Sequence, residues 1–283
     1  MSLIDAVEVP DGGSPPDLPA RHIMVSQTRA MARRSIVGTF RQPVQWIPGL
    51  IFPLMLAGIN SAAMGKTIHL PAFQAAYPGI QSFGQFLLPA TMIQGVMFGA
   101  VVAGSDVALD IENGFFERLV ASPVARSSIL VGRLAGACAL GAVQAVLFIA
   151  IFSLFGAKVA GGIGALIVLV LLAMILALAM GGLMAAIALR TGSQETVQNT
   201  FPLIFVLLFV SSAFFPTQLM TGWYQVLAEH NPITWMINGA RDLVINGFSW
   251  SSAAEALAVA AVFALGAVAL ATRQFRRRLA VAA

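Results

Sequence analysis

Charged residues are scarce in this chain of 283 residues: they make up 10% of it, whereas 58% of the residues are hydrophobic. A soluble domain has about 25% charged residues. The composition therefore predicts a membrane protein with several spans. The net charge of +4 is spread over several short segments. This pattern indicates orientation in a membrane rather than binding to nucleic acid, so no nucleic-acid partner is expected.

Cysteine is nearly absent, which limits the chemistry that the chain can carry. Cys138 is the single cysteine, so neither an internal disulfide nor a cysteine-rich metal site can form. It falls in an apolar run, where we expect a packed and unreactive thiol. The three histidines, His22, His69 and His230, lie far apart and lack the spacing of metal ligands. The sequence therefore predicts no metal site.

Motifs for ATP binding and for ion coupling are also missing. No segment reads Gly-x-x-x-x-Gly-Lys-Ser/Thr, so any ATP must bind to another chain. No Asp or Glu lies well inside an apolar run, and Glu255 sits only at the end of one. Proton- and sodium-driven transporters usually need such buried carboxylates. An ion-coupled transporter stays an alternative, because unwound backbone can bind sodium. A structural or regulatory membrane subunit without a pathway is the other alternative.

Six apolar runs approach or exceed the roughly 20 residues that cross a bilayer as a helix. The fifth is the shortest and ends near Pro216. Pro48, Pro53, Pro89 and Pro202 predict kinks or helix starts within these runs. The sequence thus predicts an all-α polytopic membrane protein with six transmembrane helices. The expected spans are residues 46–64, 83–104, 129–155, 163–189, 200–215 and 253–272.

The distribution of basic residues predicts the orientation. With the N-terminus inside, thirteen of the sixteen basic residues fall on cytoplasmic segments. Only Lys66, Lys158 and Arg241 fall outside. Cytoplasmic loops carry an excess of Lys and Arg, so both termini and the loop at residues 105–133 are expected in the cytoplasm.

The N-terminal segments are polar. Residues 1–20 are acidic and rich in Pro and Gly, which predicts a disordered cytoplasmic tail. Residues 21–41 carry five arginines and apolar residues at roughly helical spacing. We expect a helix at the membrane surface with its arginines toward anionic headgroups. A plain solvated basic segment is the alternative. Residues 279–283 are expected to form a short C-terminal tail.

The loop at residues 105–133 is the most polar stretch between two spans. It predicts a short amphipathic helix that begins near Ile111 and stops before Ser122-Pro123. Residues 115 and 119, like 116 and 120, are four apart and apolar, so they share one face. Glu112, Glu117 and Arg118 remain for water or for a protein partner. An ordinary solvated loop between two spans is the alternative.

The segment at residues 216–252 is half apolar, rich in aromatic residues, and broken by Pro and Gly. Such a segment suits short helices that enter the outer leaflet without crossing it, so we expect a re-entrant helical hairpin. Its candidate gate residues are Phe214, Phe215, Pro216, Asn231, Pro232 and Arg241. Arg241 and Asp242 are adjacent, so they do not face each other on a helix.

Two stretches resemble the ABC-2-type permeases, the membrane subunits of ABC exporters, and most closely the daunorubicin-resistance-like branch. One is residues 112–133 and the other is residues 214–247, with an Asn-Pro motif and an Arg-containing segment ending in Gly. The likeness covers residues 22–278. It implies that the 105–133 loop holds a coupling helix that docks on an ATP-hydrolysing subunit. The residues that carry this role would be Glu112, Gly114, Phe115, Phe116, Glu117, Arg118, Leu119, Ser122 and Pro123.

The resemblance also implies partners and a function. The chain would not be an enzyme by itself: two copies of an ATPase subunit would bind ATP and Mg and work with two permease chains, identical or related. The assembly would sit in the lipid bilayer of a bacterial inner membrane. It would export a hydrophobic or amphiphilic compound, such as a drug, an antibiotic or a lipid, and so contribute to multidrug resistance.

Phe201, Phe205 and Phe209 form a stripe with i, i+4 spacing in the fifth span. Helix packing or lipid contact explains such a stripe, and the alternative is that it lines an apolar route for the cargo. The resemblance favours the route, because the second and fifth spans line the pathway in this fold. Met92 and Met97 of the second span are further candidates for the lining.

Overall fold

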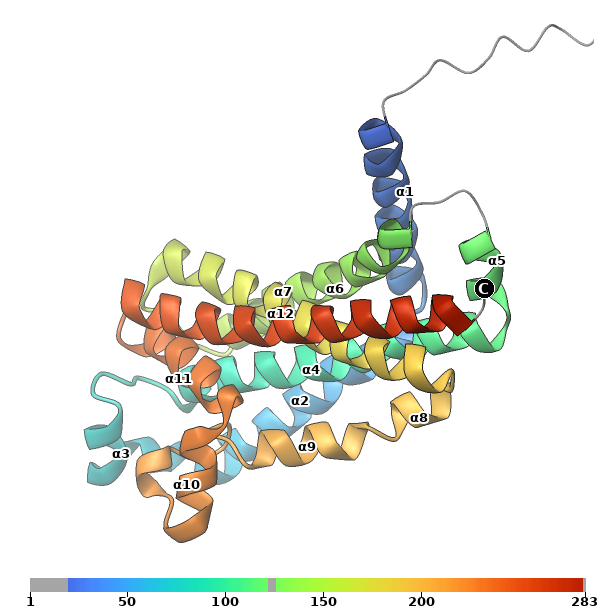
Figure 1. The fold of residues 1–283 in the computed structure, drawn as a ribbon. Coiled ribbons are helices and arrows are strands. Elements are labelled where there is room, and N and C mark those ends of the chain that lie inside the picture. The colour runs from blue at the N-terminus through green and yellow to red at the C-terminus, as the bar shows by residue number, and fades with distance from the viewer. Residues whose placement is uncertain (1–19, 122–125, 282–283) are drawn as a thin grey trace, which may run out of the picture.

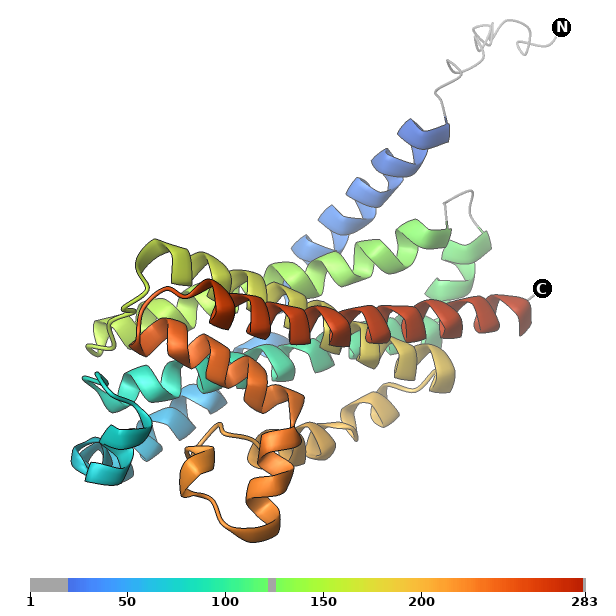
Figure 2. The same ribbon diagram turned by 60° about the vertical axis from the view of Figure 1, so that its left-hand side comes forward.

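The computed structural model describes residues 20–121 and 126–281, and these residues form helices joined by turns. Figure 1 labels the α-helices, and Figure 2 shows the same ribbon turned about the vertical axis. The bounds are α1 Ala20–Arg41, α2 Pro43–Met64, η1 Gly65–His69, α3 Pro71–Ala76, α4 Phe83–Glu112, α5 Phe115–Ala121, α6 Arg126–Leu154, α7 Gly162–Thr191, α8 Gln194–Gln198, α9 Phe201–Phe209, η2 Thr217–Leu219, α10 Gly222–His230, α11 Pro232–Ile245 and α12 Trp250–Val281.

Five of these helices are long and apolar enough to cross a membrane: α2, α4, α6, α7 and α12. They confirm an all-α polytopic membrane protein. α4 and α12 are eight or nine residues longer than the predicted spans at their C-terminal ends. The composition marks where lipid contact ends, but a helix continues into water as long as its backbone bonds and packing are favourable. The predicted tail at residues 279–283 is therefore wrong in part, since α12 runs to Val281; residues 282–283 lie outside the described chain.

The predicted fifth span is shorter than expected. Only Phe201–Phe209 is an α-helix, and the chain then turns through residues 210–215. Pro202 starts this helix at its first turn, as expected for a residue without a backbone donor. At Val210 the backbone leaves the helical region. The predicted helix over residues 200–215 is therefore wrong at its C-terminal third, although its start is correct.

α4 is the central helix of the bundle. It packs against α2, α6, α7 and α11, and most of its side chains are buried on every face. A capping box fixes its start: the Ser82 hydroxyl accepts from the Gln85 amide, and the Gln85 side chain accepts from Ser82 N. α7 packs in turn on α6 and α12. The core therefore lies between α4, α7 and α12.

The bundle has two distinct ends (Figures 1 and 2). One holds α5, the start of α6 and the last turns of α7 and α12, and we call it the α5 end. The opposite end holds α3, α10 and α11, and we call it the α3 end. Each long helix runs from one end to the other. α2, α4, α6 and α7 alternate in direction, whereas α12 ends at the α5 end, as α7 does, and so runs parallel to α7.

α1 is a helix, as predicted, and it packs along α6 while extending beyond the bundle (Figure 2). The two backbones approach closely, because a Cβ atom at Gly132 would lie 2.4 Å from the Cβ atom of Met31. The Ser35 hydroxyl also donates to the Arg133 carbonyl at 3.2 Å. Arg29, Arg33, Arg34 and Arg41 remain exposed. The predicted disordered tail, apart from Ala20, lies outside the described residues.

Candidate functional site

The predicted loop helix is two helices in the structure. α4 continues to Glu112, and the amides of Asn113 and Gly114 bond back to the carbonyls of Leu109 and Ile111 at 3.0 Å. Gly114 has a φ of 65°, which glycine adopts without steric cost, and α5 then starts at Phe115. The expectation of one helix from Ile111 is therefore wrong, because the glycine turns the chain in the middle of it.

Phe116 of α5 is buried inside this chain, with 6% of its surface exposed. Its ring meets the edge of Phe275 of α12, with the ring centres 5.7 Å apart. The Arg278 guanidinium lies 5.7 Å from the same ring centre. Phe116 is thus a packing residue that fixes α5 to α12, and it is not available to a partner in this conformation.

Phe115 and Leu119 lie on another side of α5 and are half-buried. The guanidinium of Arg34, from α1, stacks over the Phe115 ring at 4.4 Å. A cation over an aromatic face is worth about 0.5–1 kcal/mol at an exposed site. The two apolar pairs predicted from the sequence therefore contact two different helices, α12 and α1.

Arg278 joins three helices at the α5 end. One of its amino groups lies 3.5 Å from the Glu117 carboxylate of α5. The other donates to the Leu189 carbonyl in the last turn of α7 at 3.2 Å. A cation is favourable there, because the last carbonyls of a helix have no intrahelical donor. Arg278 is therefore the side chain that links α5, α7 and α12. No feature of the sequence distinguishes it from the other three C-terminal arginines.

The remaining charged residues around α5 are exposed. Glu112 accepts from the Gln194 amide at 2.7 Å, at the N-terminus of α8. Arg118 makes a long bond of 3.4 Å from its Nε to the Gly114 carbonyl. Glu117 also has half of its side chain exposed. The structure thus places these three charges on the surface of the α5 end. Ser122 and Pro123 of the predicted set lie outside the described residues.

A polar cavity of about 200 Å³ lies beside α5, between α1, α4 and α6. Asp110 of α4 forms an ion pair with Arg133 of α6 at its wall. Asp106 and Arg34 line it as well, so two acids and two bases face one small space. None of these four residues was selected from the sequence.

The predicted phenylalanine stripe is part of a longer aromatic strip. Phe201 and Phe205 contact Phe98 of α4, with ring centres 4.7 Å and 6.1 Å apart. Phe209 stacks on Phe205 at 4.6 Å. The whole strip, which we call the aromatic strip, is Phe52, Phe98, Phe201, Phe205, Phe209 and Phe214. It runs from α8 toward α10, along the direction in which the bundle would cross a bilayer.

A cavity of about 500 Å³ opens at the α8 end of the aromatic strip. Phe52, Phe98 and Phe201 line it together with apolar residues of α2 and α4. Gln45, Gln194, Gln198 and Ser105 supply its polar groups. Ligand pockets combine an apolar wall and a few polar groups in this way, with volumes of roughly 300–1,000 Å³.

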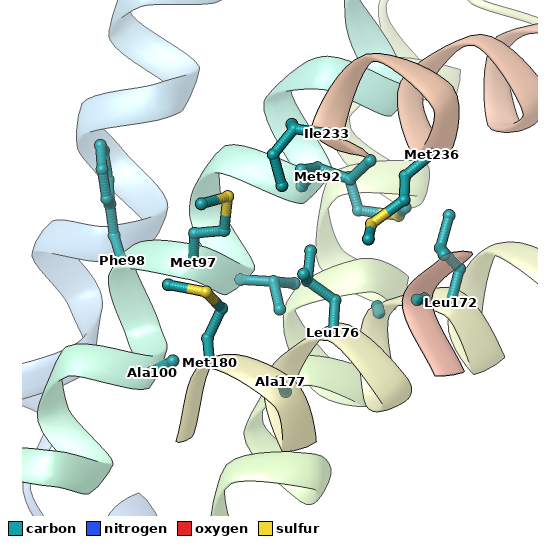
Figure 3. Close-up of a cluster of buried hydrophobic side chains, with 14 of the residues drawn as sticks. Met92, Met97, Phe98, Ala100, Leu172, Leu176, Ala177, Met180, Ile233 and Met236 are labelled. Carbon is teal, nitrogen blue, oxygen red and sulfur yellow. The ribbon is translucent and has the colours of Figure 1, made fainter. Parts of the chain in front are cut away.

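Met92 and Met97 do not line this cavity. Both are fully buried, at 0% exposure, in the core between α4, α7 and α11. Figure 3 shows Met97 near Met180, whereas the neighbouring Phe98 points to the side of α2. Successive residues on a helix point about 100° apart, so only one of the two can face the strip. The structure therefore places these methionines in the packing of the core and Phe98 in the aromatic strip.

Arg241 is the centre of the α3 end and is fully buried. Its Nε donates to the Phe86 carbonyl at 3.1 Å, and its amino groups donate to the Ser212 carbonyl at 2.9 Å, to Asn238 at 3.2 Å and to the Tyr77 hydroxyl at 3.3 Å. Its guanidinium also stacks over the Phe86 ring at 3.8 Å. Every partner is neutral. Arg241 thus ties α11 to α4, to the end of α3 and to the turn after α9.

The Asn-Pro motif closes a helix end. Asn231 accepts from the Ile233 amide at 2.9 Å and so caps α11, while Pro232 takes its first position. The side-chain amide of Asn231 also donates to the carbonyls of Leu207 and Val210, at 2.8 and 2.7 Å. These carbonyls end α9 without helical donors. One residue therefore satisfies two helix ends and places α11 beside α9.

The other three predicted gate residues lie near this junction. Phe214 belongs to the aromatic strip, with its ring centre 4.9 Å from that of Phe209. Pro216 is buried and precedes the 3₁₀ turn η2. Phe215 is exposed. The segment expected to form a re-entrant hairpin contains the two short helices α10 and α11, with α11 packed on α4 and α12; entry into the outer leaflet stays a prediction.

Comparison with known protein families identifies the family to which this chain belongs. The family described as ABC-2 type transporter matches residues 26–245. The chain belongs to the ABC-2 type transporter family. An ABC-2 membrane subunit associates with an ABC ATPase and with the lipid bilayer, and this chain is a membrane protein of that kind.

Three similar proteins cover most of this ABC-2 chain. The daunorubicin resistance ABC transporter permease protein DrrB1 of Streptomyces coeruleorubidus is 24% identical over 80% of this chain and 77% of its own length. The putative transport permease ycf38 of Pyropia yezoensis is 27% identical over 78% and 75%. The probable doxorubicin resistance permease DrrC of Mycobacterium tuberculosis (strain ATCC 25618 / H37Rv) is 19% identical over 81% and 80%.

Several residues of the ABC-2 subunit that organise the site carry no local sequence signal. Phe52 joins the aromatic strip from α2, and Gln144 of α6 is fully buried although its side-chain amide has no protein partner among the described residues. A polar residue inside an apolar run is the signal that could have selected Gln144. The contacts of Arg278 and Phe52 depend on which helices pack together, and a single apolar run of sequence does not show this.

Proposed function

We propose that this chain is the membrane subunit of an ATP-driven exporter that moves hydrophobic or amphiphilic compounds out of the cytoplasm or its inner leaflet. The observation that carries the proposal is α5. It is a short helix at one end of five long apolar helices, and it presents exposed charges while its apolar side chains hold it to α1 and α12. Such a helix offers a partner a fixed surface.

The α5 end faces the cytoplasm in this proposal. Thirteen of the sixteen basic residues belong to the segments assigned to the α5 end of the bundle. Cytoplasmic segments carry an excess of Lys and Arg, so this distribution supports the orientation. Both termini are then cytoplasmic, and the membrane is a bacterial inner membrane. The ATPase subunits, with ATP and Mg, bind on this side.

Two permease chains and two ATPase chains make the complete transporter. The first half of α2, toward the α5 end, supports a second permease chain, because α2 is the least covered of the five long helices and packs mainly on α4. Its exposed apolar side chains include Val44, Ile51 and Met55. The two permease chains are identical, or related as in a heterodimer.

The aromatic strip is the proposed route of the cargo. Phe201 and Phe209 keep 38% and 41% of their surface exposed, so the strip can contact a molecule that passes along it. Planar apolar compounds stack on such rings. Relatives named for daunorubicin and doxorubicin resistance support a cargo of this chemical class.

Movement would pass from the ATPase to the route through two connections. α5 follows α4 after a single glycine turn, and α4 carries Phe98 of the aromatic strip. α5 also contacts α12 through Phe116 and Arg278, and α12 packs along α7. If closure of the ATPase subunits on ATP displaces α5, the displacement would therefore shift both α4 and the pair of α7 and α12.

The first test is a pull-down of the tagged full-length chain in mild detergent, followed by reconstitution with the ATPase that copurifies. Arg118→Glu reverses an exposed charge on α5 with little loss of internal contact, so it should weaken copurification and uncouple ATP hydrolysis from export. Glu112→Arg should do the same. Glu229→Arg, an exposed reversal on α10 at the α3 end, is the control and should copurify normally.

Two outcomes would contradict the proposal. If no ATPase copurifies with the folded chain, an ion-coupled transporter or a structural subunit explains the protein better. If the ATPase copurifies but hydrolysis never responds to apolar compounds and none is exported, the chain is a regulatory subunit. Normal copurification and export by the Arg118→Glu variant would show that α5 is not the docking helix.

A further inference from the structure

A groove of about 830 Å³ lies on the side of α2 that faces away from the aromatic strip. It runs between the second half of α2, the first turn of α4 and the last turn of α6 at the α3 end. We call it the α2–α6 groove. It shares no lining residue with the cavity beside the aromatic strip. Its described lining residues are Leu54, Ala57, Gly58, Ser61, Ala62, Gly65, Ile68, Gln81, Ser82, Phe83, Gly84, Ile151, Phe152 and Phe155.

The groove lies beside the second half of α2, beyond a close crossing with α4. At Gly49 a Cβ atom would lie 3.4 Å from the Gly99 amide nitrogen, so α2 and α4 touch there through their backbones. Gly58 lies two and a half turns later and therefore on the opposite face of α2, where a Cβ atom would meet nothing within 4 Å. No described side chain of this protein covers α2 at that point.

The residues that line the groove favour a hydrocarbon chain as its occupant. Most of the described lining residues are apolar, and none of them is charged. Phe155 stands at the end of α6 with 86% of its surface exposed. The groove opens at the depth of spanning helices, where the surrounding solvent is lipid. An unfilled space would forfeit dispersion contacts along its whole wall, so an acyl chain is the favoured occupant.

The mouth of the groove is polar, and two lysines follow its lining residues closely in the chain. The Gln81 and Ser82 side chains line it, and the N-terminus of α4, which starts there, carries amides without helical acceptors. Lys66 lies between the lining residues Gly65 and Ile68. Lys158 follows α6, and its carbonyl accepts from the Gln85 side chain at 2.7 Å, next to the cap of α4.

These are the two lysines of the whole chain, and both are exposed. The basic residues of the α5 end are arginines instead. Lysine side chains can extend along an apolar surface and place their charge at the headgroup level. Because no carboxylate lines the groove among the described residues, the mouth favours a negatively charged group.

We propose that the α2–α6 groove binds one anionic phospholipid of the bilayer leaflet at the α3 end. Its acyl chain lies between α2 and α6, and its phosphate lies at the mouth flanked by Lys66 and Lys158. This leaflet is the outer one in the orientation proposed above; the binding itself does not depend on export or on the ATPase. The lipid thereby fills the groove and supports α2 from the side opposite the cargo route.

The test places the full-length chain in nanodiscs of phosphatidylcholine or phosphatidylglycerol, with a trace of the same lipid carrying a diazirine on its acyl chain. After illumination, labelled peptides are mapped by mass spectrometry without nucleotide. We expect labelling at residues 151–155 and 54–62. Gly58→Leu, which places a side chain into open space within the groove, should reduce labelling at residues 151–155 severalfold.

Gly266→Leu is the matched control. Gly266 is also an exposed glycine inside an apolar helix, and a Cβ atom there meets nothing within 4 Å. This variant should label residues 151–155 like the unaltered chain. Replacing both Lys66 and Lys158 by Gln should keep the labelling but lower the preference for phosphatidylglycerol over phosphatidylcholine, by roughly fivefold for each lysine.

Three results would overturn the proposal. Equal labelling in the Gly58→Leu variant and the unaltered chain would mean that the groove holds no acyl chain. No labelling at residues 151–155 in the unaltered chain would mean that another occupant, such as a second permease chain, covers the groove. An unchanged lipid preference in the double lysine variant would exclude headgroup recognition at the mouth. All three readouts are independent of ATP hydrolysis, so a failure of the proposed export function would leave them unchanged.

Discussion

The two ends of the bundle are held together in different ways. At the α5 end the contacts lie near the surface: Arg278 with Glu117, and Arg34 over Phe115. At the α3 end a fully buried Arg241 donates to four neutral groups. Exposed ion pairs contribute about 0–1 kcal/mol each to the free energy of unfolding, whereas removing the partners of a buried charge lowers it by several kcal/mol. The polar contacts at the α5 end can therefore rearrange at small cost, whereas those at the α3 end keep their geometry.

This difference suits a transporter that is driven from one side. A docking helix must change position when its partner moves, and weak surface contacts allow this. The helical hairpin α10–α11 must keep the opposite end of the bundle assembled while the other end moves. Asn231 strengthens that end further, because it caps α11 and satisfies the last carbonyls of α9. The following changes test the comparison, in order of decreasing effect.

Arg241→Met should have the largest effect. It removes a charge together with four hydrogen bonds, including those to the buried carbonyls of Phe86 and Ser212. We expect a loss of about 3–5 kcal/mol in stability, measured by thermal unfolding in detergent. Arg241→Lys should recover only part of it, because one ammonium group cannot reproduce the fork of a guanidinium. Arg190→Met, an exposed arginine at the α5 end, is the control. A small effect of Arg241→Met would contradict the conclusion that the α3 end is held more firmly than the α5 end.

Phe116→Ala should have the next largest effect. The ring is buried against Phe275, so its removal leaves a cavity between α5 and α12. We expect a loss of about 3 kcal/mol, detected as a lower unfolding midpoint and as weaker copurification of the ATPase. Phe115→Ala, on the half-buried neighbour beneath Arg34, should cost about 1 kcal/mol. Equal effects of the two substitutions would contradict the assignment of Phe116 to the core.

Phe205→Ala should change transport more than stability. Phe205 lies in the middle of the aromatic strip, in ring contact with Phe98 and Phe209. Loss of one aromatic contact is worth about 0.5–1.5 kcal/mol, so export of a planar aromatic compound should fall roughly threefold to tenfold. Leu203→Ala, an exposed position on the same helix, should leave the rate unchanged. An equal fall in both variants would mean that α9 contributes through packing alone. The readout is uptake into inverted vesicles.

The smallest effect is expected for the pair of Arg278 and Glu117. A double-mutant cycle with Arg278→Gln and Glu117→Gln should give a coupling energy below about 1 kcal/mol, since both side chains are partly exposed. The unfolding midpoint in each variant is the measurement. A coupling of several kcal/mol would show that the α5 end is as rigid as the α3 end. Export should nevertheless fall in the Arg278→Gln variant, because α12 then follows α5 less closely.

The starts of most long helices could be predicted within a few residues, because Pro43, Ser82 and Pro232 carry their signals locally. Their ends were predicted less well. α4 continues for eight residues beyond the apolar run, since backbone bonding and contacts with α5 and α8 favour the helix there. The fifth span was overestimated because apolar composition also describes the turns at residues 210–215. These turns are held by a hydrogen bond from the Asn231 side chain to the Val210 carbonyl and by one from the Ala213 amide to the Ser211 hydroxyl.

The candidate site was predicted in parts. A short helix in the polar loop and the phenylalanine stripe followed from composition and spacing; the docking role of that helix followed from the resemblance and stays a prediction. Phe116 was expected at a partner surface, but the bend at Gly114 turns it onto α12. Met97 was selected for the route in place of Phe98, because the sequence does not state which face of α4 meets α9. These errors concern the direction of a side chain, not the choice of segment.

The sequence by itself determined that this is an all-α membrane protein with a polar loop after its second span, because hydropathy and helical period depend only on neighbouring residues. Membership of the ABC-2 family agrees with that pattern. Tertiary structure alone decided which side chains meet: Arg278 with Glu117 and Leu189, and Arg241 with Phe86 and Ser212. Such contacts join residues that are far apart in the chain, so they exist only once the helices have packed.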